Sequence, residues 1–314
     1  MAYRANDSNS WSHSDSSGTT SYVPNLFSSM LLKEYYEKDV MTAITNNDAD
    51  SSGIKEKGDR VTFRKLPAIS ISDHAINDTI TYERLTSTAI TLIIDRAKRY
   101  AFKLDDIDKK QMDMLLDSKF IEHARKEMSQ TIQQEFLADM VDEAHASNLG
   151  LTAGVKSASI NLGTHTSPLP LTKSNILDFF EDMKLVLAEQ DVQVEDSSQL
   201  FVVVPPAVAS LVGRSDLNGA NFNGGNEALV NKAGFVGQLA GFNIMSTNSV
   251  PVDGSKEYDI LFCHKSAICY AMQLAQNQLI PQLETQFGCG FRGMMLFGWK
   301  VLENVALGNA VVTV

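Results

Sequence analysis

The feature that most constrains this chain is an amphipathic stretch over residues 105–148, which has the spacing of one long helix. Its apolar side chains recur mostly three or four residues apart, so they share one helical face. No proline or glycine interrupts them, three aspartates precede them, and Asn148 and Gly150 are typical of a helix end. The sequence therefore predicts a helix over residues 105–148, about 60 Å long.

This stretch is too acidic to cross a membrane and too irregular for a coiled coil. It carries eleven acidic and five basic side chains, which a hydrocarbon core would not accept. Its apolar residues advance mostly by fours, whereas a coiled-coil seam alternates threes and fours. Two interpretations stay open: a long helix packed on a sheet of its own chain, or a rod in an extended subunit whose other surfaces contact neighbouring copies.

The composition limits the classes of protein to which the chain can belong. With 314 residues, 44% of them hydrophobic, the chain can bury a core and hold two or more structural units. A net charge of −11 argues against tight nucleic-acid binding. Three cysteines without metal-type spacing favour reduced thiols in a cytoplasmic compartment. Neither a signal peptide nor a membrane span is indicated, so we expect a soluble protein.

The first hundred residues predict an amino-terminal extension, residues 1–57, followed by a projecting hairpin. Residues 1–57 begin with a polar segment and contain a short helix at about 26–46. Residues 58–104 change to a period of two, with an outgoing strand, a polar tip and a return strand over 88–104. Such a hairpin would project about 40 Å and is marginal in water by itself, so we expect another surface to cover it.

The hairpin and the long helix carry opposite charge. Residues 80–104 contain five basic and two acidic side chains, which favours an intermolecular contact with the acidic helix; the alternative is that both are ordinary solvated faces. The basic candidates for this contact between subunits are Arg84, Arg96, Lys98 and Arg99. The acidic candidates on the helix are Asp117, Glu122, Glu127, Glu135 and Asp139.

The remainder of the chain predicts a compact α/β unit and a set of late strands. Residues 172–190 predict a helix, residues 200–204 a buried strand closed by two prolines, and residues 207–212 another helix. Further strands are expected at 242–246 and 260–264, and a helix or strand near 267–273. Two separate strands at 282–291 and 294–302 and a last strand at 305–314 complete the pattern.

The sequence predicts no active site. The glycines of residues 234–242 lack the spacing of a phosphate-binding loop, and no GxSxG nucleophile motif is present. His123 with Glu127, and Asp142 with His145, lie one helical turn apart, but a metal site would need matching pairs on other helices. We therefore expect no catalytic, metal or cofactor-binding residues and no enzymatic activity.

The order of parts resembles that of the major capsid proteins of tailed bacteriophages, which have the Hong Kong 97 fold of the α+β class. The resemblance covers essentially the entire chain, and no catalytic signature carries it. The best matching stretches are IDRAKRYAFKLDDIDKKQ at 94–111, LFVVVPPAVASLVG at 200–213, GFVGQLAGFNIMSTNSVP at 234–251 and FGCGFRGMMLFGWKVL at 287–302.

The resemblance implies a role for each segment. Residues 1–57 would form the N-arm, 58–104 the E-loop, and 105–171 a P-domain with its spine helix at 105–148. Residues 172–279 would form the A-domain, 280–300 the returning P-domain strands, and 301–314 a last strand that rejoins the A-domain. The A-domains would meet at the centres of hexamers and pentamers, and each E-loop would lie over a neighbour's spine helix.

The resemblance also implies partners. The chain would assemble with itself into the icosahedral head that encloses double-stranded DNA. A portal protein and a decoration protein would be further partners. The chain would be a virion protein that is assembled in the host bacterial cytoplasm. Its acidic balance favours enclosing DNA without binding it tightly. Some relatives begin with a scaffolding segment that is cleaved off. This chain starts directly at the N-arm, so we expect a separate scaffolding protein.

One departure and two alternatives stay open. Some relatives cross-link subunits through an E-loop lysine, but residues 72–87 contain none, which predicts non-covalent shells. An encapsulin-type nanocompartment would share the fold and carry cargo enzymes instead of DNA. A soluble α/β enzyme with a helical insertion would be a monomer or small oligomer with a ligand pocket in residues 172–279.

Overall fold

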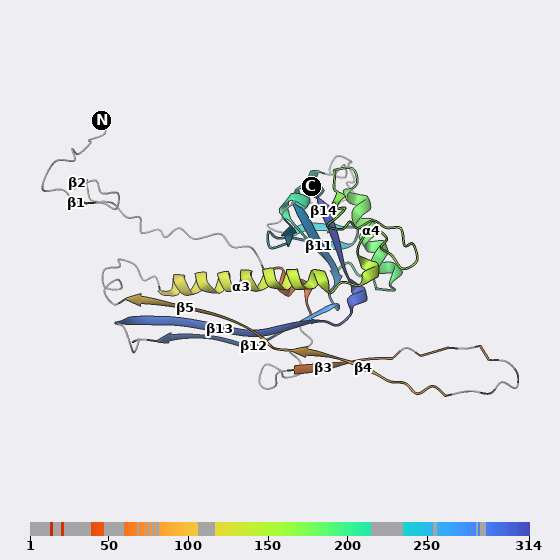
Figure 1. Ribbon diagram of the computed structural model, residues 1–314, viewed down its shortest axis with the longest axis horizontal. Coiled ribbons are helices and arrows are strands. Elements are labelled where there is room, and N and C mark those ends of the chain that lie inside the picture. Colours follow the sequence, from red (N-terminus) through yellow and green to blue (C-terminus); the bar gives the residue numbers. More distant parts are fainter. Residues whose placement is uncertain are drawn as a thin grey trace.

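The computed structural model describes residues 13–14, 20–21, 39–46, 60–67, 69–71, 73–74, 76, 79, 82–105, 117–214, 235–253, 256–280, 282 and 287–314. It has an α/β unit at one end and a long helix lying along a narrow sheet (Figure 1). A two-stranded arm extends from the region where these two parts meet. Both helix and sheet are therefore present, as the α+β prediction requires.

The α/β unit is built on a seven-stranded sheet. Its order is β6 (Leu169–Pro170), β14 (Leu307–Thr313), β11 (Glu257–His264), β7 (Leu200–Val204), β9 (Phe242–Ser246) and β8 (Phe235–Leu239), with β10 (Val252–Asp253) paired to β11. Pairs β7–β9 and β14–β6 are parallel, and the other pairs are antiparallel.

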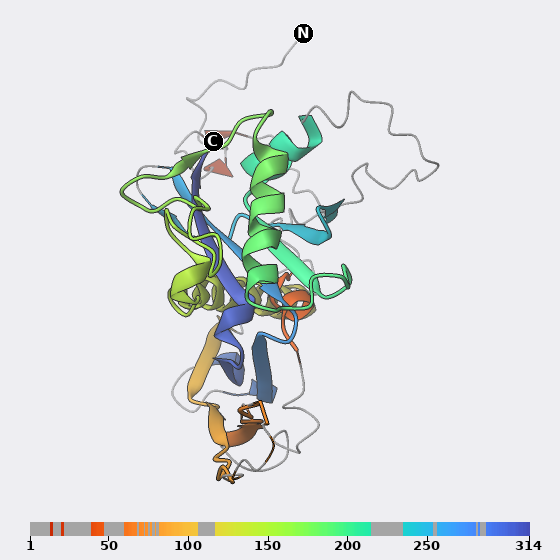
Figure 2. The same cartoon turned by 90° about the vertical axis from the view of Figure 1, so that its right-hand side faces the viewer.

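Two helices accompany this sheet. Helix α4 (Ile176–Glu189) lies across one face (Figure 2) and buries Phe179, Phe180 and Met183 in a core shared with β7 and β14. Helix α5 (Pro206–Arg214) begins at the second of the two prolines after β7, because a proline ring suits the first turn of a helix. All five residues of β7 are buried because both faces of the sheet are covered.

The extended part consists of one helix on a three-stranded antiparallel sheet. Helix α3 (Asp117–Asp142) lies along strands β12 (Ile268–Ile280), β13 (Gly288–Val301) and β5 (Arg96–Asp105), which pair in that order. The carboxyl-terminal half of α3 also reaches the second face of the α/β sheet, where Phe136, Leu137 and Met140 are buried. One core therefore joins the two parts of the molecule.

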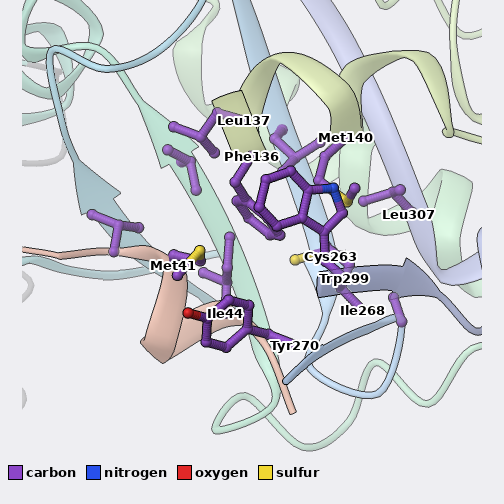
Figure 3. Close-up of a cluster of buried hydrophobic side chains, with 14 of the residues drawn as sticks. Met41, Ile44, Phe136, Leu137, Met140, Cys263, Ile268, Tyr270, Trp299 and Leu307 are labelled. Atoms are coloured by element: carbon purple, nitrogen blue, oxygen red, sulfur yellow. The ribbon is translucent and has the colours of Figure 1, made fainter. Parts of the chain in front are cut away.

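Figure 3 shows this joint. Side chains from α3 and Trp299 of β13 meet Cys263 of β11 and Leu307 of β14. The short helix α1 (Met41–Ile44) adds Met41 and Ile44, so a segment from the amino-terminal region is fixed in the same core.

The arm is a hairpin of β3 (Arg60–Lys65) and β4 (Thr88–Ile93), paired over six residues. A small core at its root buries Leu92 and Ile94 of the arm against Cys269 and Ala271 of β12. At Gly298 the backbones come so close that an added Cβ would lie 2.3 Å from the carbonyl oxygen of Ile93. The root is thus packed, while the rest of the arm extends away from the body (Figure 1).

The helix predicted over 105–148 is shorter in the structure. Asp105 is not helical: it is the last residue of β5, where it pairs with Gly288 of β13. Residues 106–116 lie outside the described residues. At the other end α3 stops at Asp142, and Asn148 lies in a separate 3-10 turn, η2 (Ala146–Asn148), because its amide bonds the carbonyl oxygens of Val305 and Leu307.

Three strand predictions also change. The expected return strand at 88–104 divides into β4, which pairs with β3, and β5, which leaves the arm and pairs with β13. The two strands expected at 282–291 and 294–302 form one continuous strand, β13. Strand β12, expected within the α/β unit, belongs to the sheet under α3 instead.

The last strand, β14, lies between β6 and β11 in the sheet of the α/β unit. The polar amino-terminal segment lies mostly outside the described residues, and so does the part of the helix expected at about 26–46 that precedes residue 39.

Candidate functional site

The candidate site is the surface formed by α3, β5, β13 and the arm, where the predicted charged residues gather. Alternation along β5 directs Arg96, Lys98 and Phe102 toward α3, and leaves Arg99 exposed on the opposite face. Arg96 Nη2 lies 2.6 Å from Asp139 Oδ2, and Lys98 pairs with Glu135. These side chains are partly exposed, so each pair contributes at most about 1 kcal/mol.

Arg96 and Asp139 also bind a tryptophan of the neighbouring strand. The Arg96 guanidinium lies over the Trp299 ring, 4.1 Å from its centroid. Trp299 Nε1 donates a hydrogen bond to Asp139 Oδ2 at 3.3 Å, and Phe136 meets the indole edge-on at 5.4 Å. One cation–π contact and one shared carboxylate therefore connect β5, α3 and β13 just beside the root of the arm.

A cavity of about 330 Å³ opens at this point. Its lining is mostly charged, unlike the mainly apolar pockets that hold small molecules. The lining residues are Arg96, Asp139, Met140, Asp142, Glu143, Trp299, Lys300 and Val301.

Beyond its root, the arm carries large apolar side chains in open solvent. Ile71 is 96% exposed and Tyr82 is 94% exposed. Leu66, Ile69 and Ile76 are also exposed, and Leu85 is about half exposed. A monomeric protein rarely presents so many large apolar groups on one projecting element, so this arm has the character of an interaction surface.

The nine predicted interface residues fall into different settings. Arg96 with Asp139, and Lys98 with Glu135, meet inside one chain. Glu122 pairs with Lys126 one turn along α3, at 2.7 Å.

The other predicted residues do not meet one another in any described contact. Arg84 lies on the exposed arm, Arg99 on the outer face of β5, Glu127 on the exposed side of α3, and Asp117 is its first residue. The charge complementarity of the sequence is therefore expressed in part within the chain. Roles of the nine residues between subunits stay predictions.

Sequence reasoning missed the two most distinctive elements of this surface. Trp299 lies in a predicted strand, but its contacts depend on the pairing of β13 with β5, which no local pattern indicates. The polar composition of the tip gives no indication that the arm exposes large apolar side chains. Their signal in the sequence was the recurrence of Ile69, Ile71 and Ile76 among polar neighbours.

The described residues contain no group of three or more His, Cys, Asp or Glu side chains placed to hold a metal ion. All three cysteines are buried, and burial raises the pKa of the Cys263 thiol to about 12, so it stays protonated at neutral pH. None of the described helices is long and apolar enough to span a bilayer.

Comparison with known proteins supports the fold strongly. No protein-family model and no curated protein matches the chain. Among solved structures, a protein of Mycobacterium phage Che8 is 21% identical, with a TM-score of 0.68 over 92% of this chain and 96% of the other. The capsid of the cyanophage P-SCSP1u is 14% identical, with a TM-score of 0.63 over 92% of both chains.

The capsid of Myoviridae phage XM1 is also 14% identical, with a TM-score of 0.61 over 92% of this chain and 96% of the other. These likenesses span nearly the entire chain. They confirm the predicted fold: this protein has the Hong Kong 97-type fold found in phage capsids.

Proposed function

We propose that this chain is the major capsid protein of a tailed bacteriophage, a structural protein without enzymatic activity. It self-assembles as hexamers and pentamers into the icosahedral head that encloses double-stranded DNA. The observation that carries this proposal is the fold that the chain shares with phage capsids over 92% of its length.

The exposed arm gives the proposal a physical basis. Each large apolar side chain that a partner covers completely contributes about 1.5–3 kcal/mol. Five such side chains project from the arm: Leu66, Ile69, Ile71, Ile76 and Tyr82. Covering them with a second copy removes the unfavourable contact with water. Symmetry then repeats this moderate interface at every subunit, and the sum closes a stable shell.

In this proposal some charged residues act within one subunit and others act between subunits. Arg96, Lys98, Glu135 and Asp139 fix the direction in which the arm leaves the body, because their ion pairs and the Trp299 contact hold β5 on α3. Arg84 and Arg99 then contact acidic side chains of a neighbour's helix, Glu127 and Asp117 among them. Such exposed pairs guide the orientation of subunits more than they add affinity.

The same proposal includes the other members of the particle. A portal protein occupies one vertex, a separate scaffolding protein directs closure, and a decoration protein binds the finished shell. The net charge of −11 supports an acidic surface that encloses DNA without sequence-specific binding. Assembly takes place in the host cytoplasm and the mature protein is part of the virion.

The test is to purify the expressed chain, with and without the candidate scaffolding protein, and to examine it by light scattering and negative-stain microscopy. Closed shells, or rings of five and six subunits, are expected. A uniformly monomeric or dimeric protein in the presence of scaffolding protein would refute the proposal and favour a soluble α/β enzyme. Shells filled with folded cargo enzymes in place of DNA would indicate an encapsulin-type compartment.

A further inference from the structure

A tight turn at the edge of the α/β sheet carries a histidine, His165. Thr164 and Ser167 exchange two backbone hydrogen bonds, of 3.1 and 3.0 Å, around it. The chain just before the turn is fixed on β14: Val311 N donates to Leu162 O at 2.9 Å, and a Cβ on Gly163 would lie 2.1 Å from Val311 O. The backbone therefore holds His165 at one place on the sheet.

The ring of His165 lies against two buried carboxylates of β11. Nδ1 is 3.5 Å from Glu257 Oε2, and Nε2 is 3.4 Å from Asp259 Oδ1. Glu257 is only 7% exposed and Asp259 only 6%, whereas the His165 side chain is 52% exposed. Two buried acids thus face one ring that solvent reaches.

Two buried oxygens of this cluster, one on Glu257 and one on Asn309, lack a hydrogen-bond donor among the described residues. Asn309 Nδ2 donates to Asp259 Oδ1 at 3.1 Å, but Glu257 Oε2 and Asn309 Oδ1 have no hydrogen-bond partner among the described residues. A buried carboxylate is costly unless an opposite charge or donors compensate it. Among the described residues, the charged groups that form ion pairs with the His165 ring are Glu257 and Asp259 of β11. Strand β14 contributes the neutral Asn309.

We propose that His165 is a proton-operated latch that holds the 164–167 turn on the sheet of the α/β unit. The imidazolium carries an N–H on both ring nitrogens and serves both carboxylates at once. The neutral ring keeps one N–H, so its other nitrogen directs a lone pair at a carboxylate oxygen. Loss of the proton therefore loosens the turn. This inference rests on the α/β unit alone and is independent of the proposed function.

The direction of the pH effect follows from this chemistry. The latch is closed while the imidazole carries its second proton, and it opens when that proton is lost. Protonation of the ring therefore strengthens the contact between the turn and the sheet, and loss of the proton weakens it.

The test compares the full-length chain with H165Q and E257Q by thermal unfolding at about pH 5.5 and about pH 8. The Tm advantage of the wild type over H165Q is expected to be larger at the lower pH by about 2–4 °C. E257Q removes the buried charge, so it is expected to unfold below the wild type at the lower pH and to equal or exceed it at the higher pH. H74Q, which alters an exposed histidine of the arm, is the control and is expected to show no such dependence.

A local measurement keeps the proposal testable if H165Q does not fold. Hydrogen exchange of the wild-type peptide covering residues 161–170, corrected for the intrinsic rate, is expected to slow at the lower pH, and E257Q is expected to abolish that change. A Tm difference between wild type and H165Q that is the same at both pH values would overturn the proposal. Stabilisation by added Zn²⁺ at the higher pH that both variants abolish would replace the proton with a metal ion.

Discussion

Two buried amides fix how the long helix meets the rest of the molecule. Gln133 accepts a hydrogen bond from Val40 N at 2.8 Å and donates one to Thr247 at 3.0 Å, so it joins α3 to the segment before α1 and to the loop after β9. Asn148 does the same for the chain beyond α3. Apolar packing tolerates small shifts, whereas these bonds require one geometry.

Replacing Asn148 with alanine is expected to destabilise the folded chain by about 2 kcal/mol. Its Nδ2 donates to the carbonyl oxygens of Val305 and Leu307, at 2.7 and 2.9 Å, and its Oδ1 accepts from Gln190 at 3.1 Å. Truncation leaves these groups without their partner at a position where the Asn148 side chain is fully buried. Chemical denaturation measures the loss. The exposed Asn304 is the matched control, and Asn304→Ala should change stability by less than about 0.5 kcal/mol; equal losses would contradict the argument.

Glu189 supplies a pH-dependent contact at the end of α4. Its carboxylate accepts hydrogen bonds from the backbone N–H groups of Ser157 and Lys156, which hold its pKa below the ordinary value of 4.5. A lowered pKa means that the contribution to stability is present above pH 4.5 and disappears as pH falls through the lower value. Thermal unfolding of wild type and E189Q from about pH 6 to about pH 3 is expected to show a wild-type advantage that vanishes at the acid end. An advantage that grows toward acid pH would contradict this.

At the scale of elements, periodicity in the sequence predicted the existence of the long helix but not its bounds. The apolar spacing of residues such as Phe136 and Met140 is local information, and both are buried in α3. The end of β5 at Asp105 depends instead on Gly288, which is far along the chain. No local pattern contains that pairing.

The charge pattern shows the same limit. Basic residues before the helix and acidic residues within it favoured a contact between subunits, which stays a prediction. The sequence could not tell a contact inside one chain from a contact between copies, because that depends on whether β5 lies beside α3 of the same chain. Arg96 with Asp139, and Lys98 with Glu135, show that part of the complementarity is internal.

The apolar side chains of the arm are expected to matter for assembly and not for folding. The variant Ile71→Ser, Ile76→Ser should unfold within about 2 °C of the wild type. Its critical concentration for assembly should rise tenfold or more, since each covered isoleucine contributes about 1.5–3 kcal/mol. Light scattering against concentration measures this. Thr86→Ser, an exposed polar change on the same arm, is the control; unchanged assembly of the double variant would show that the arm does not carry the interface.

The root of the arm is expected to tolerate no side chain at Gly298. An added Cβ would lie 2.3 Å from Ile93 O and 3.1 Å from Ile94 Cα, which are both backbone atoms. Gly298→Ala should therefore destabilise the chain by about 1–3 kcal/mol, as measured by chemical denaturation. Gly213, at which a Cβ would meet nothing within 4 Å, provides the control, and Gly213→Ala in helix α5 should be neutral or stabilising. The reverse order of the two effects would refute the steric argument.

At the scale of the whole molecule, the chain packs its two parts together but leaves large apolar side chains of the arm exposed. One core joins the α/β unit to the helix and its narrow sheet, and from that joint the arm carries apolar side chains into solvent. Local periods in the sequence predicted that a long helix, a hairpin and an α/β unit exist, and the helix α3, the strand pair β3–β4 and the seven-stranded sheet are present. What the sequence could not predict is which surfaces a single chain covers, since that depends on long-range pairings such as those of β13 with β5 and β12.

The proposed shell should be held together without covalent bonds between subunits. An isopeptide cross-link through a lysine at the tip of the arm would need an amine there, and residues 72–87 contain no lysine. Disulfides are equally disfavoured, because Cys263, Cys269 and Cys289 are all buried in the folded subunit. Purified particles boiled in detergent, with and without reductant, should therefore give one band at 34.5 kDa on an electrophoresis gel. Particles treated with glutaraldehyde before boiling provide the positive control. A ladder of multiples in untreated particles would refute the prediction, and its sensitivity to reductant would tell a disulfide from an amide bond.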